Sequence, residues 1–329
     1  MGGSGLRPYR PGDQPAAGSV PVTAIVLTRD ESANLDRCLA SLGWAAQRVV
    51  LDSGSTDGTV AQAKVAGAEV VEEPWRGYGG QRELALRLPG LRHDWVYFVD
   101  ADEWVSPQLA AELAAVLPAP DHDGYAQRFR LVFQGRWIRH CGWYRGAWIT
   151  RLVRRPAARF GAAGSGAAGF GERVQVTGSV GRLRHDLVDE DRKGLASWLR
   201  KHVRYAELEA ERRGQALPLA ARWRAFRAGR AGDTRPLPRA LAKDLVFPAV
   251  PVRPLALFCY MYLLRFGFLD GLAGLRFCLY HAWFQLTVDA LRAEARAGGR
   301  DSAEATAGTR RGSRAWHRSR RRSGGSRSR

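Results

Sequence analysis

Residues 95–107 read WVYFVDADEWVSP, and this stretch decides the fold class. It opens on an apolar run of the kind found in a strand that is buried on both faces of a parallel sheet. Asp100 and Asp102 stand at the end of that strand, and because side chains alternate along an extended chain, both carboxylates can address one site. Two such oxygen ligands suit Mg²⁺ or Mn²⁺, which keeps its other positions for water and diphosphate oxygens. The stretch therefore predicts a metal site at the carboxyl edge of a sheet.

Strands and helices alternate around this stretch. Short apolar runs predict strands at 22–28, 48–52, 68–74 and 95–100. Helices are expected at about 35–42, 59–67, 79–88 and 107–117. Such an alternation predicts an α/β fold with a mainly parallel central sheet and helices on both faces. In this architecture the loops at the carboxyl ends of the strands form the binding crevice.

The pattern changes after residue 124. The stretch 125–133 alternates apolar and polar residues, and a segment rich in Trp, Arg and Gly follows to residue 155. A Gly/Ala-rich loop, a helix at about 194–213 and a Pro/Arg-rich stretch come next. These shifts predict a disordered N-terminus (1–20), an α/β domain (21–215), a linker (216–253), membrane-associating helices (254–296) and a disordered Arg-rich tail (297–329).

The segment 254–291 is strongly apolar, but Arg265, Asp270 and Arg276 interrupt it. No uninterrupted run reaches the roughly 20 residues that a membrane-spanning helix needs. We expect two amphipathic, aromatic-rich helices that lie in the membrane interface, because Trp, Tyr and Arg flank the apolar blocks. The alternative is that both helices pack on the α/β domain as part of its core.

The charge and the cysteine content restrict the kinds of partner and the cellular compartment that we expect for the protein. The formal net charge is +19, and +10 remains without the nine arginines of residues 310–329. A basic body suits nucleotide diphosphates, phospholipid headgroups or nucleic acid, and charge alone does not choose among them. The four cysteines form no C-x-x-C pair, and the first 20 residues contain no apolar run. We therefore expect reduced thiols, no signal peptide, and a cytoplasmic protein at the inner face of the cell membrane.

Asp52 closes the strand at 48–52 at the same predicted edge as Asp100. The small residues Ser53, Gly54 and Ser55 follow it. A carboxylate in this place can accept hydrogen bonds from a base or a ribose, while small residues let the backbone approach a ligand. Asp57 is expected to cap the next helix instead.

Three ordered motifs resemble those of glycosyltransferase family 2. The stretch TRDESANLDRCLASL (28–42) looks like the family's first strand-and-helix signature, VVLDSGSTDGT (49–59) like its nucleotide loop, and VDADEWVSP (99–107) like its metal motif. The resemblance covers roughly residues 21–290. Within it, PWRGYGGQRELAL, FQGRWIRHCGWY and RLVRR look most like the bacterial lipopolysaccharide-core β-glucosyltransferase branch.

The resemblance implies a GT-A fold and inversion by direct displacement at the anomeric carbon. It also implies a UDP-sugar donor, Mg²⁺ or Mn²⁺, and a glycolipid or saccharide acceptor. Carried onto this sequence, the metal and the diphosphate fall to Asp100 and Asp102. The remaining residues implied at the nucleotide-sugar site are Thr28, Glu31, Asp52, Ser53, Gln81, Arg82 and Ala101.

Direct displacement needs two kinds of help. A metal neutralises charge on the departing diphosphate, which makes Asp102 a catalytic candidate, and a carboxylate must deprotonate the attacking hydroxyl. Glu172 in GFGERVQV is the candidate base, since it matches the Glu of a His-Glu pair in the branch. Gly171 stands where the His is expected, and a surface glutamate on a loop is the alternative for Glu172.

Aromatic and basic residues between 133 and 155 are candidates for the acceptor site. Such side chains can stack on a sugar ring and reach phosphates or carboxylates. The candidates are Arg136, Trp137, Trp143, Tyr144 and Arg151. For Trp137 the alternative is a packed aromatic cluster. The processive synthases of the superfamily carry Q-x-x-R-W, whereas Gln134 stands one residue too close here, so we expect a single transfer.

Three rival functions fit less well. A sugar-phosphate nucleotidyltransferase needs a Gly-rich, Arg/Lys-bearing loop after the first strand, where this sequence has TRDES. A nicotinamide oxidoreductase needs G-x-G-x-x-G after that strand. A nucleic-acid-binding protein would rest on the Arg-rich tail, in which Trp316 offers little stacking surface. We therefore expect a glycosyltransferase with no specific nucleic-acid partner.

Overall fold

The structure is a computed structural model that describes residues 20–142, 144, 146, 148–161, 174–214 and 252–323, without the side chains of 212, 214 and 298–323. The chain divides into two compact units, which are Met1–Lys201 with Leu255–His281 and His202–Pro254 with Ala282–Arg329. Each unit is considered by itself below. Glu172, Trp143 and almost all of the predicted linker lie outside the described residues.

A seven-stranded sheet organises the described part of the first unit, in the order β12-β6-β9-β4-β1-β2-β3. Its strands are β1 (Val20–Thr28), β2 (Ala45–Asp52), β3 (Glu69–Glu72), β4 (Trp95–Asp100), β6 (Gly124–Gln127), β9 (Ile149–Arg154) and β12 (Val180–Arg182). Strands β4, β1, β2 and β3 run parallel, whereas β9 is antiparallel to both β4 and β6. The predicted α/β fold with a mainly parallel sheet is confirmed.

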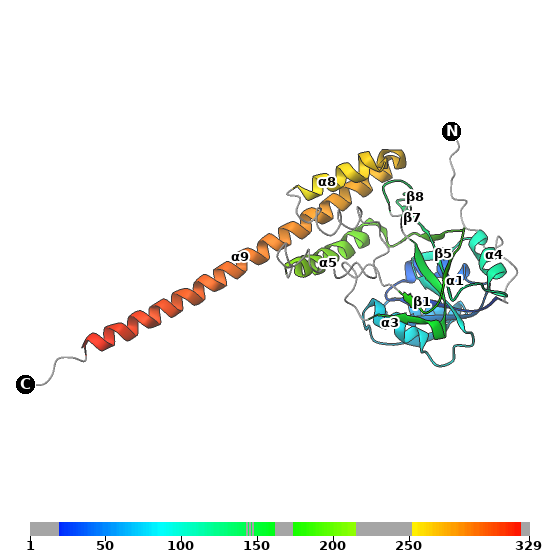
Figure 1. The fold of residues 1–329 in the computed structure, drawn as a ribbon, viewed down its shortest axis with the longest axis horizontal. Helices are drawn as coiled ribbons and strands as arrows, with labels where there is room; N and C mark the ends of the chain where they lie inside the picture. Colours follow the sequence, from blue (N-terminus) through cyan, green and yellow to red (C-terminus); the bar gives the residue numbers. More distant parts are fainter. Residues whose placement is uncertain are drawn as a thin grey trace, which may run out of the picture. The chain divides into compact units, whose positions relative to one another are not determined.

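The four predicted helices lie on the two faces of this sheet. They are α1 (Ser32–Ala40), α2 (Thr59–Val65), α3 (Tyr78–Leu86) and α4 (Pro107–Val116). Figure 1 shows the ribbon of this unit, with strand β1 and helices α1, α3 and α4 labelled. Alternate residues of β4 separate the faces: Tyr97 and Val99 pack with α1, α2 and α4 in one core, while Val96 and Phe98 pack with α3 in another. Because both faces of β4 are covered, the strand is apolar throughout and delivers Asp100 to the carboxyl edge.

Smaller sheets extend the first unit. A four-stranded sheet has the order β5-β13-β7-β8, formed by β5 (Glu103–Val105), β13 (Leu187–Asp189), β7 (Phe129–Phe133) and β8 (Arg136–Trp137). The short turn η2 (Arg155–Ala157) leads to a two-stranded sheet of β10 (Ala158–Phe160) and β11 (Val174–Val176). Strand β5 follows β4 almost directly and pairs antiparallel with β13, with Glu103 opposite Asp189. The second sheet therefore brings a distant stretch of chain to the end of β4.

The apolar C-terminal segment is broken rather than continuous. Helix α8 (Arg253–Cys259) continues as a π-helical turn η7 (Tyr260–Leu264), and the 3₁₀ turn η8 (Gly267–Asp270) leads into α9 (Gly271–Ser323). In the first unit Met261 and Phe277 are buried against Phe133 and Ile138. One face of this segment thus packs as core, the alternative that the sequence leaves open, whereas another face stays exposed.

Helix α5 (Gly194–Gly214) and α9 each run on into the second unit, where Ala206, Ala210 and Val288 form a small buried cluster. The composition predicts a disordered tail from residue 297, whereas α9 is helical as far as Ser323. No proline follows Pro254, and the Ala and Arg of this stretch favour helix.

No single helix in the described ranges is both long and apolar enough to cross a membrane. The pair 253–264 and 267–297, bent by 73° at its break, meets that length and composition together.

Candidate functional site at the carboxyl edge of the sheet

Strands β1, β2 and β4 end side by side and present polar residues at one edge. Thr28 lies opposite Asp52 in the register of β1 and β2, and Leu27 lies opposite Asp100 in that of β1 and β4. The predicted residues Thr28, Asp52 and Asp100 are therefore brought together by the sheet itself. This edge is where parallel α/β sheets bind their ligands.

Asp52 organises the loop that follows β2. Its buried carboxylate accepts hydrogen bonds from Thr28 Oγ1 at 2.8 Å, Ser55 Oγ at 2.5 Å, and the N–H groups of Gly54 and Ser55 at 3.0 and 2.8 Å. Gly54 takes a φ of +83°, which glycine adopts without strain. Four accepted hydrogen bonds leave little capacity for a ligand, so the geometry gives Asp52 a positioning role. A direct contact of Asp52 with a nucleoside stays a prediction.

The loops after β1 and β2 brace each other. Asp30 donates its N–H to Ser55 Oγ at 2.8 Å, and its carboxylate accepts the N–H of Thr56 at 2.7 Å. Asp57 accepts the N–H of Ser32 at 3.1 Å and that of Thr59 at 3.0 Å. The N-cap of α2 is Gly58 rather than the predicted Asp57, because the helix begins one residue later. Asp57 still accepts the N–H of the first helical residue, Thr59, and ties the start of α2 to α1. The carboxyl edge is therefore lined by the backbone and the small side chains of these two loops.

Asp100 lies between two arginines. Its carboxylate oxygens are 2.6 Å from Arg82 Nη2, on α3, and 2.6 Å from Arg151 Nη2, on β9. Burial would raise the pKa of Asp100, but the charges of Arg151 and Arg82 hold it far below its usual value. Arg151 also contacts Glu103 at 2.5 Å. Arg151, predicted for the acceptor, and Arg82, predicted for the donor, therefore both contact Asp100.

Asp102 differs from Asp100 because, among the described residues, the cation that pairs with its carboxylate is the distant Lys201 Nζ at 3.9 Å. Burial raises the pKa of Asp102, Lys201 opposes the rise, and the charges of Asp100 and Asp191 add to it. Excess negative charge of this kind fits a bound cation. In the described ranges no three His, Cys, Asp or Glu side chains are arranged to hold a metal ion. A metal at Asp102 would therefore need ligand phosphates to complete its coordination, which is the way Mg²⁺ is commonly bound.

The sequence analysis missed a segment that reaches this edge, residues 189–193. Strand β13 carries it there, and the N–H of Glu190 donates to the carbonyl of Asp102 at 2.9 Å. Burial, together with the charges of Asp102 and Glu103, raises the pKa of Asp189 well above its usual value. The acidic and basic run DEDRK directly after a short apolar pair is the signal that could have revealed it.

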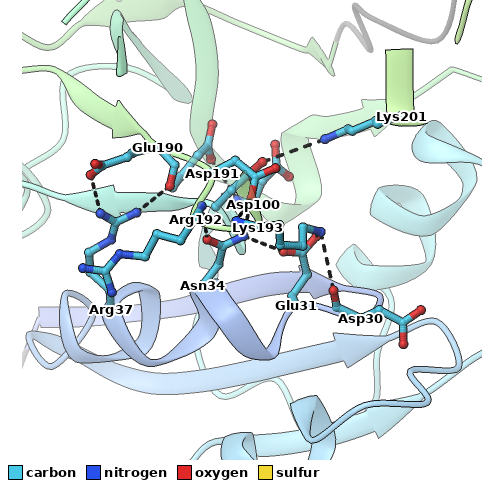
Figure 2. A network of polar contacts seen from close by, with 12 residues as sticks. Asp30, Glu31, Asn34, Arg37, Asp100, Glu190, Asp191, Arg192, Lys193 and Lys201 are labelled. Carbon is cyan, nitrogen blue, oxygen red and sulfur yellow. Dashed lines mark hydrogen bonds and ion pairs between the residues drawn. The ribbon is translucent and has the colours of Figure 1, made fainter. Parts of the chain in front are cut away.

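Figure 2 shows how this segment is joined to α1. Asn34 Nδ2 donates to Glu31 at 2.9 Å and to Asp191 at 3.0 Å, and Lys193 Nζ lies 2.5 Å from Glu31 Oε1. Arg37 pairs with Glu190. Burial and the charge of Asp102 raise the pKa of Glu31, which Lys193 opposes. Glu31, predicted to contact the nucleoside, thus belongs to one network with the neighbours of Asp102.

The other predicted donor residues lie around the same carboxylates. Ala101 and Ser53 are buried directly after β4 and β2. Gln81 is fully buried on α3; its Oε1 accepts the N–H of Arg76 at 3.3 Å, while its Nε2 has no hydrogen-bond partner among the described residues. A buried amide that lacks an acceptor is a place where a ligand oxygen would be favourable.

The predicted acceptor residues separate into three places. Trp137 and Tyr144 pack edge to face at 5.0 Å, and Tyr144 OH donates to the buried Asp186 at 3.0 Å. Arg136 instead donates to the carbonyl of Leu269 at 3.3 Å. Arg151 contacts Asp100, as described above, and Trp143 lies outside the described residues.

Arginines that the sequence analysis did not select surround the aromatic pair. Arg130 lies over Trp137 at 4.9 Å, Arg128 over Tyr144 at 4.6 Å, and Arg182 over Trp148 at 4.8 Å. Trp148 immediately precedes β9, which runs antiparallel to β4, so the start of β9 lies near the end of β4. This cluster of arginines and aromatic rings is therefore close to the carboxyl edge, with Asp186 as its buried acid.

A pocket of about 340 Å³ lies elsewhere, at the beginning of β4, where Asp94, His122 and Arg154 line it. Its position is at the end of the strand opposite Asp100. The sheet topology and the charge pattern, rather than this hollow, locate the candidate site.

Comparison with known proteins places the described edge in a family context. Residues 23–170 match the model of Glycosyl transferase family 2. An uncharacterized glycosyltransferase of Rickettsia bellii is 36% identical over 117 residues, which are 35% of this chain and 39% of the relative. The lipopolysaccharide core biosynthesis glycosyltransferase LpsC of Rhizobium meliloti is 38% identical over 107 residues, 31% of this chain and 39% of LpsC. The chain thus spans about two fifths of the length of these relatives.

Among solved structures, S. aureus TarS 1–349 in complex with UDP-GlcNAc is similar over 84% of this chain and 92% of TarS, with 15% identity and a TM-score of 0.41.

Proposed function

We propose, from the match of residues 23–170 to Glycosyl transferase family 2, that the chain is an inverting GT-A glycosyltransferase. It moves a sugar, glucose or a related hexose, from a UDP-sugar to a glycolipid or lipopolysaccharide-type acceptor at the cytoplasmic face of a membrane. The observation that carries the proposal is the carboxyl edge, where the ends of β1, β2 and β4 gather Thr28, Asp52 and Asp100 beside Asp102.

The donor site is proposed to lie over the braced loops after β1 and β2. Asp52 and Asp57 hold these loops, so that their backbone is ordered before a nucleotide binds. The side-chain oxygen of Gln81 accepts a hydrogen bond from the backbone N–H of Arg76. This bond orients the buried Nε2 of the same amide. Ordered backbone and buried donors lower the entropy lost on binding.

Asp102 is proposed as the metal ligand, with Asp100 as its neighbour in the D-x-D pair. A divalent cation bound there, Mg²⁺ or Mn²⁺, would neutralise charge on the departing diphosphate. Asp100 itself is kept ionised by Arg82 and Arg151, and these two ion pairs fix the end of β4, from which the turn with Asp102 begins. Glu172 remains the proposed base.

The acceptor is proposed to bind at the cluster of arginines and aromatic rings near β9. Trp137, Tyr144 and Trp148 offer ring faces and edges, and Arg128 and Arg130 supply positive charge beside them. Rings of this kind pack on sugars, and guanidinium groups bind phosphates or carboxylates in a fork geometry. An acidic glycolipid or saccharide has the chemistry that such a cluster recognises.

The test is Asp102→Asn in the full chain, with Asp36→Asn, an exposed site on α1, as the matched control. We expect the Asp102 variant to lose at least about a hundredfold in transfer rate and to keep its melting temperature. Calorimetry should also detect loss of Mn²⁺-dependent UDP binding, and EDTA should mimic the variant reversibly. Full transfer in EDTA would contradict the metal assignment.

A screen of UDP- and GDP-sugars tests the reaction class and the donor. Release of UDP without pyrophosphate is expected of a transferase, whereas release of pyrophosphate from UTP and a sugar phosphate would favour the nucleotidyltransferase alternative.

A further inference from the structure

The segment that joins α8 to α9 in the first unit, residues 260–272, holds large apolar side chains in solvent. We call it the apolar turn. Each of its outward side chains is between 46% and 72% exposed: Tyr260, Leu263, Leu264, Phe266, Phe268, Leu269 and Leu272. Scattered exposed leucines are ordinary on a soluble protein, but a contiguous set of this size marks an interaction surface.

The inward side of the apolar turn is fastened to the domain. The buried carboxylate of Asp270 accepts the N–H groups of Arg139, His140 and Cys141 at 3.2, 2.9 and 3.0 Å. His140 Nδ1 lies 2.7 Å from the same carboxylate. A Cβ on Gly267 would come within 2.9 Å of the Cys141 side chain, so the backbone approaches as closely as glycine allows. The turn is therefore held in one conformation.

The conformation of the apolar turn is costly in water. Phe266 takes a φ of +59°, the left-handed region that a bulky side chain rarely adopts, and the residue is still 47% exposed. Strain without compensating burial of the ring is typical of functional sites, where a partner stabilises what folding alone does not.

Positive charge surrounds the exposed apolar side chains. Arg265 lies over the ring of Tyr260 at 6.0 Å, Arg136 donates to the carbonyl of Leu269, and the exposed Arg276 donates to Gln134 Oε1 at 2.8 Å. Asp270 is the one acid in the sequence 260–272, and it is buried. An apolar centre with aromatic rings and a cationic rim complements an anionic bilayer surface, in which phosphates lie above acyl chains.

We propose that the apolar turn is a membrane-docking element that inserts into one leaflet of an anionic bilayer. Leu263, Leu264 and Phe268 enter the boundary between headgroups and acyl chains, while Arg265 and Arg276 contact lipid phosphates. The element goes beyond sugar transfer, because lipid binding by the turn does not require an active catalytic site.

Flotation of the full chain with vesicles tests this proposal. The paired variant Leu264→Glu with Phe268→Glu changes side chains that already face water, and Val65→Glu, at a 90% exposed site on α2, is the matched control. With vesicles containing phosphatidylglycerol, we expect the paired variant to lose at least tenfold in partitioning and the control to bind as the unchanged chain does. Equal binding of the paired variant would overturn the proposal, and so would turn-dependent dimerisation without lipid binding.

Two further measurements are informative. The first separates the contribution of the arginines from that of the apolar side chains, and the second distinguishes docking on one leaflet from spanning of the bilayer. Arg265→Gln with Arg276→Gln should weaken binding to anionic vesicles and leave the weaker binding to phosphatidylcholine vesicles unchanged. A Phe268→Trp probe should be quenched more by lipids brominated near the headgroup than by lipids brominated near the bilayer centre. Stronger quenching at the centre would contradict the interfacial element and support the bent pair as a broken span.

Discussion

At the scale of the residue, substitution of Asp52 tests its role at the carboxyl edge of the sheet. Asp52→Ala removes the acceptor of four hydrogen bonds and leaves the N–H groups of Gly54 and Ser55 without their partner. We expect UDP affinity to fall by about 1–3 kcal/mol and the melting temperature to fall with it, because the loop loses its order. Calorimetry with UDP measures the first effect. An unchanged affinity would move the nucleoside away from this loop.

The same scale shows where sequence reasoning on the site stops. Strand alternation predicts that Asp100 and Asp102 share an edge, because that inference needs only the run 95–100 and its end. It does not predict that Arg82 and Arg151 pair with Asp100, since these arginines come from α3 and β9 and meet it only in the folded chain. Which charged side chains become neighbours depends on the tertiary fold, whereas periodicity can be read from the sequence.

At the scale of the element, the clamp between Asp270 and residues 139–141 should contribute to stability. Burial would raise the pKa of Asp270, but hydrogen bonds from Cys141 and His140 lower it below the usual 3.8. A lowered pKa in the folded state stabilises the fold above the unfolded pKa, and this contribution is lost as the pH falls through the folded value. Asp270→Asn should therefore reduce the free energy of unfolding by about 1–3 kcal/mol at pH 7.

Urea unfolding at pH 7 and at pH 3 measures this effect of Asp270→Asn. The difference between the variant and the unchanged chain should be smaller at pH 3, because the unchanged chain then loses part of the stability that the charge of Asp270 contributes, whereas the amide of the variant does not titrate. A difference that stays constant between the two pH values would mean that the charge of Asp270 does not stabilise the turn.

Elements with a strong period could be predicted, and short or irregular ones could not. The helices α1 to α4 and the strands β1 to β4 follow from apolar runs and stripes in the sequence. Strand β13 is three residues long and pairs with two partners that are far away in sequence, so no local pattern marks it. The antiparallel insertion of β9 between β4 and β6 is likewise set by tertiary pairing.

At the scale of the whole molecule, the C-terminal segment has two separable roles. Met261 and Phe277 fill a buried cluster with Phe133 and Ile138 in the first unit, so this part of the segment belongs to the core. The arginines of residues 310–329 contribute charge, and +10 of the formal +19 remains without them. The buried residues should affect the stability of the fold, whereas the arginines should affect adsorption to membranes.

Two truncations separate these roles. Removal of residues 310–329 should leave the melting temperature and transfer unchanged and weaken adsorption to anionic vesicles, most visibly at low salt, because exposed charges are screened over about 8 Å at 0.15 M salt. Truncation at residue 250 should instead lower the melting temperature sharply, because it removes Met261 and Phe277 and exposes Phe133 to water. Scanning calorimetry and vesicle flotation measure the two effects. A chain truncated at residue 250 that melts as the full chain does would show that residues 255–281 are not part of the core, and the apolar turn would then lack its support.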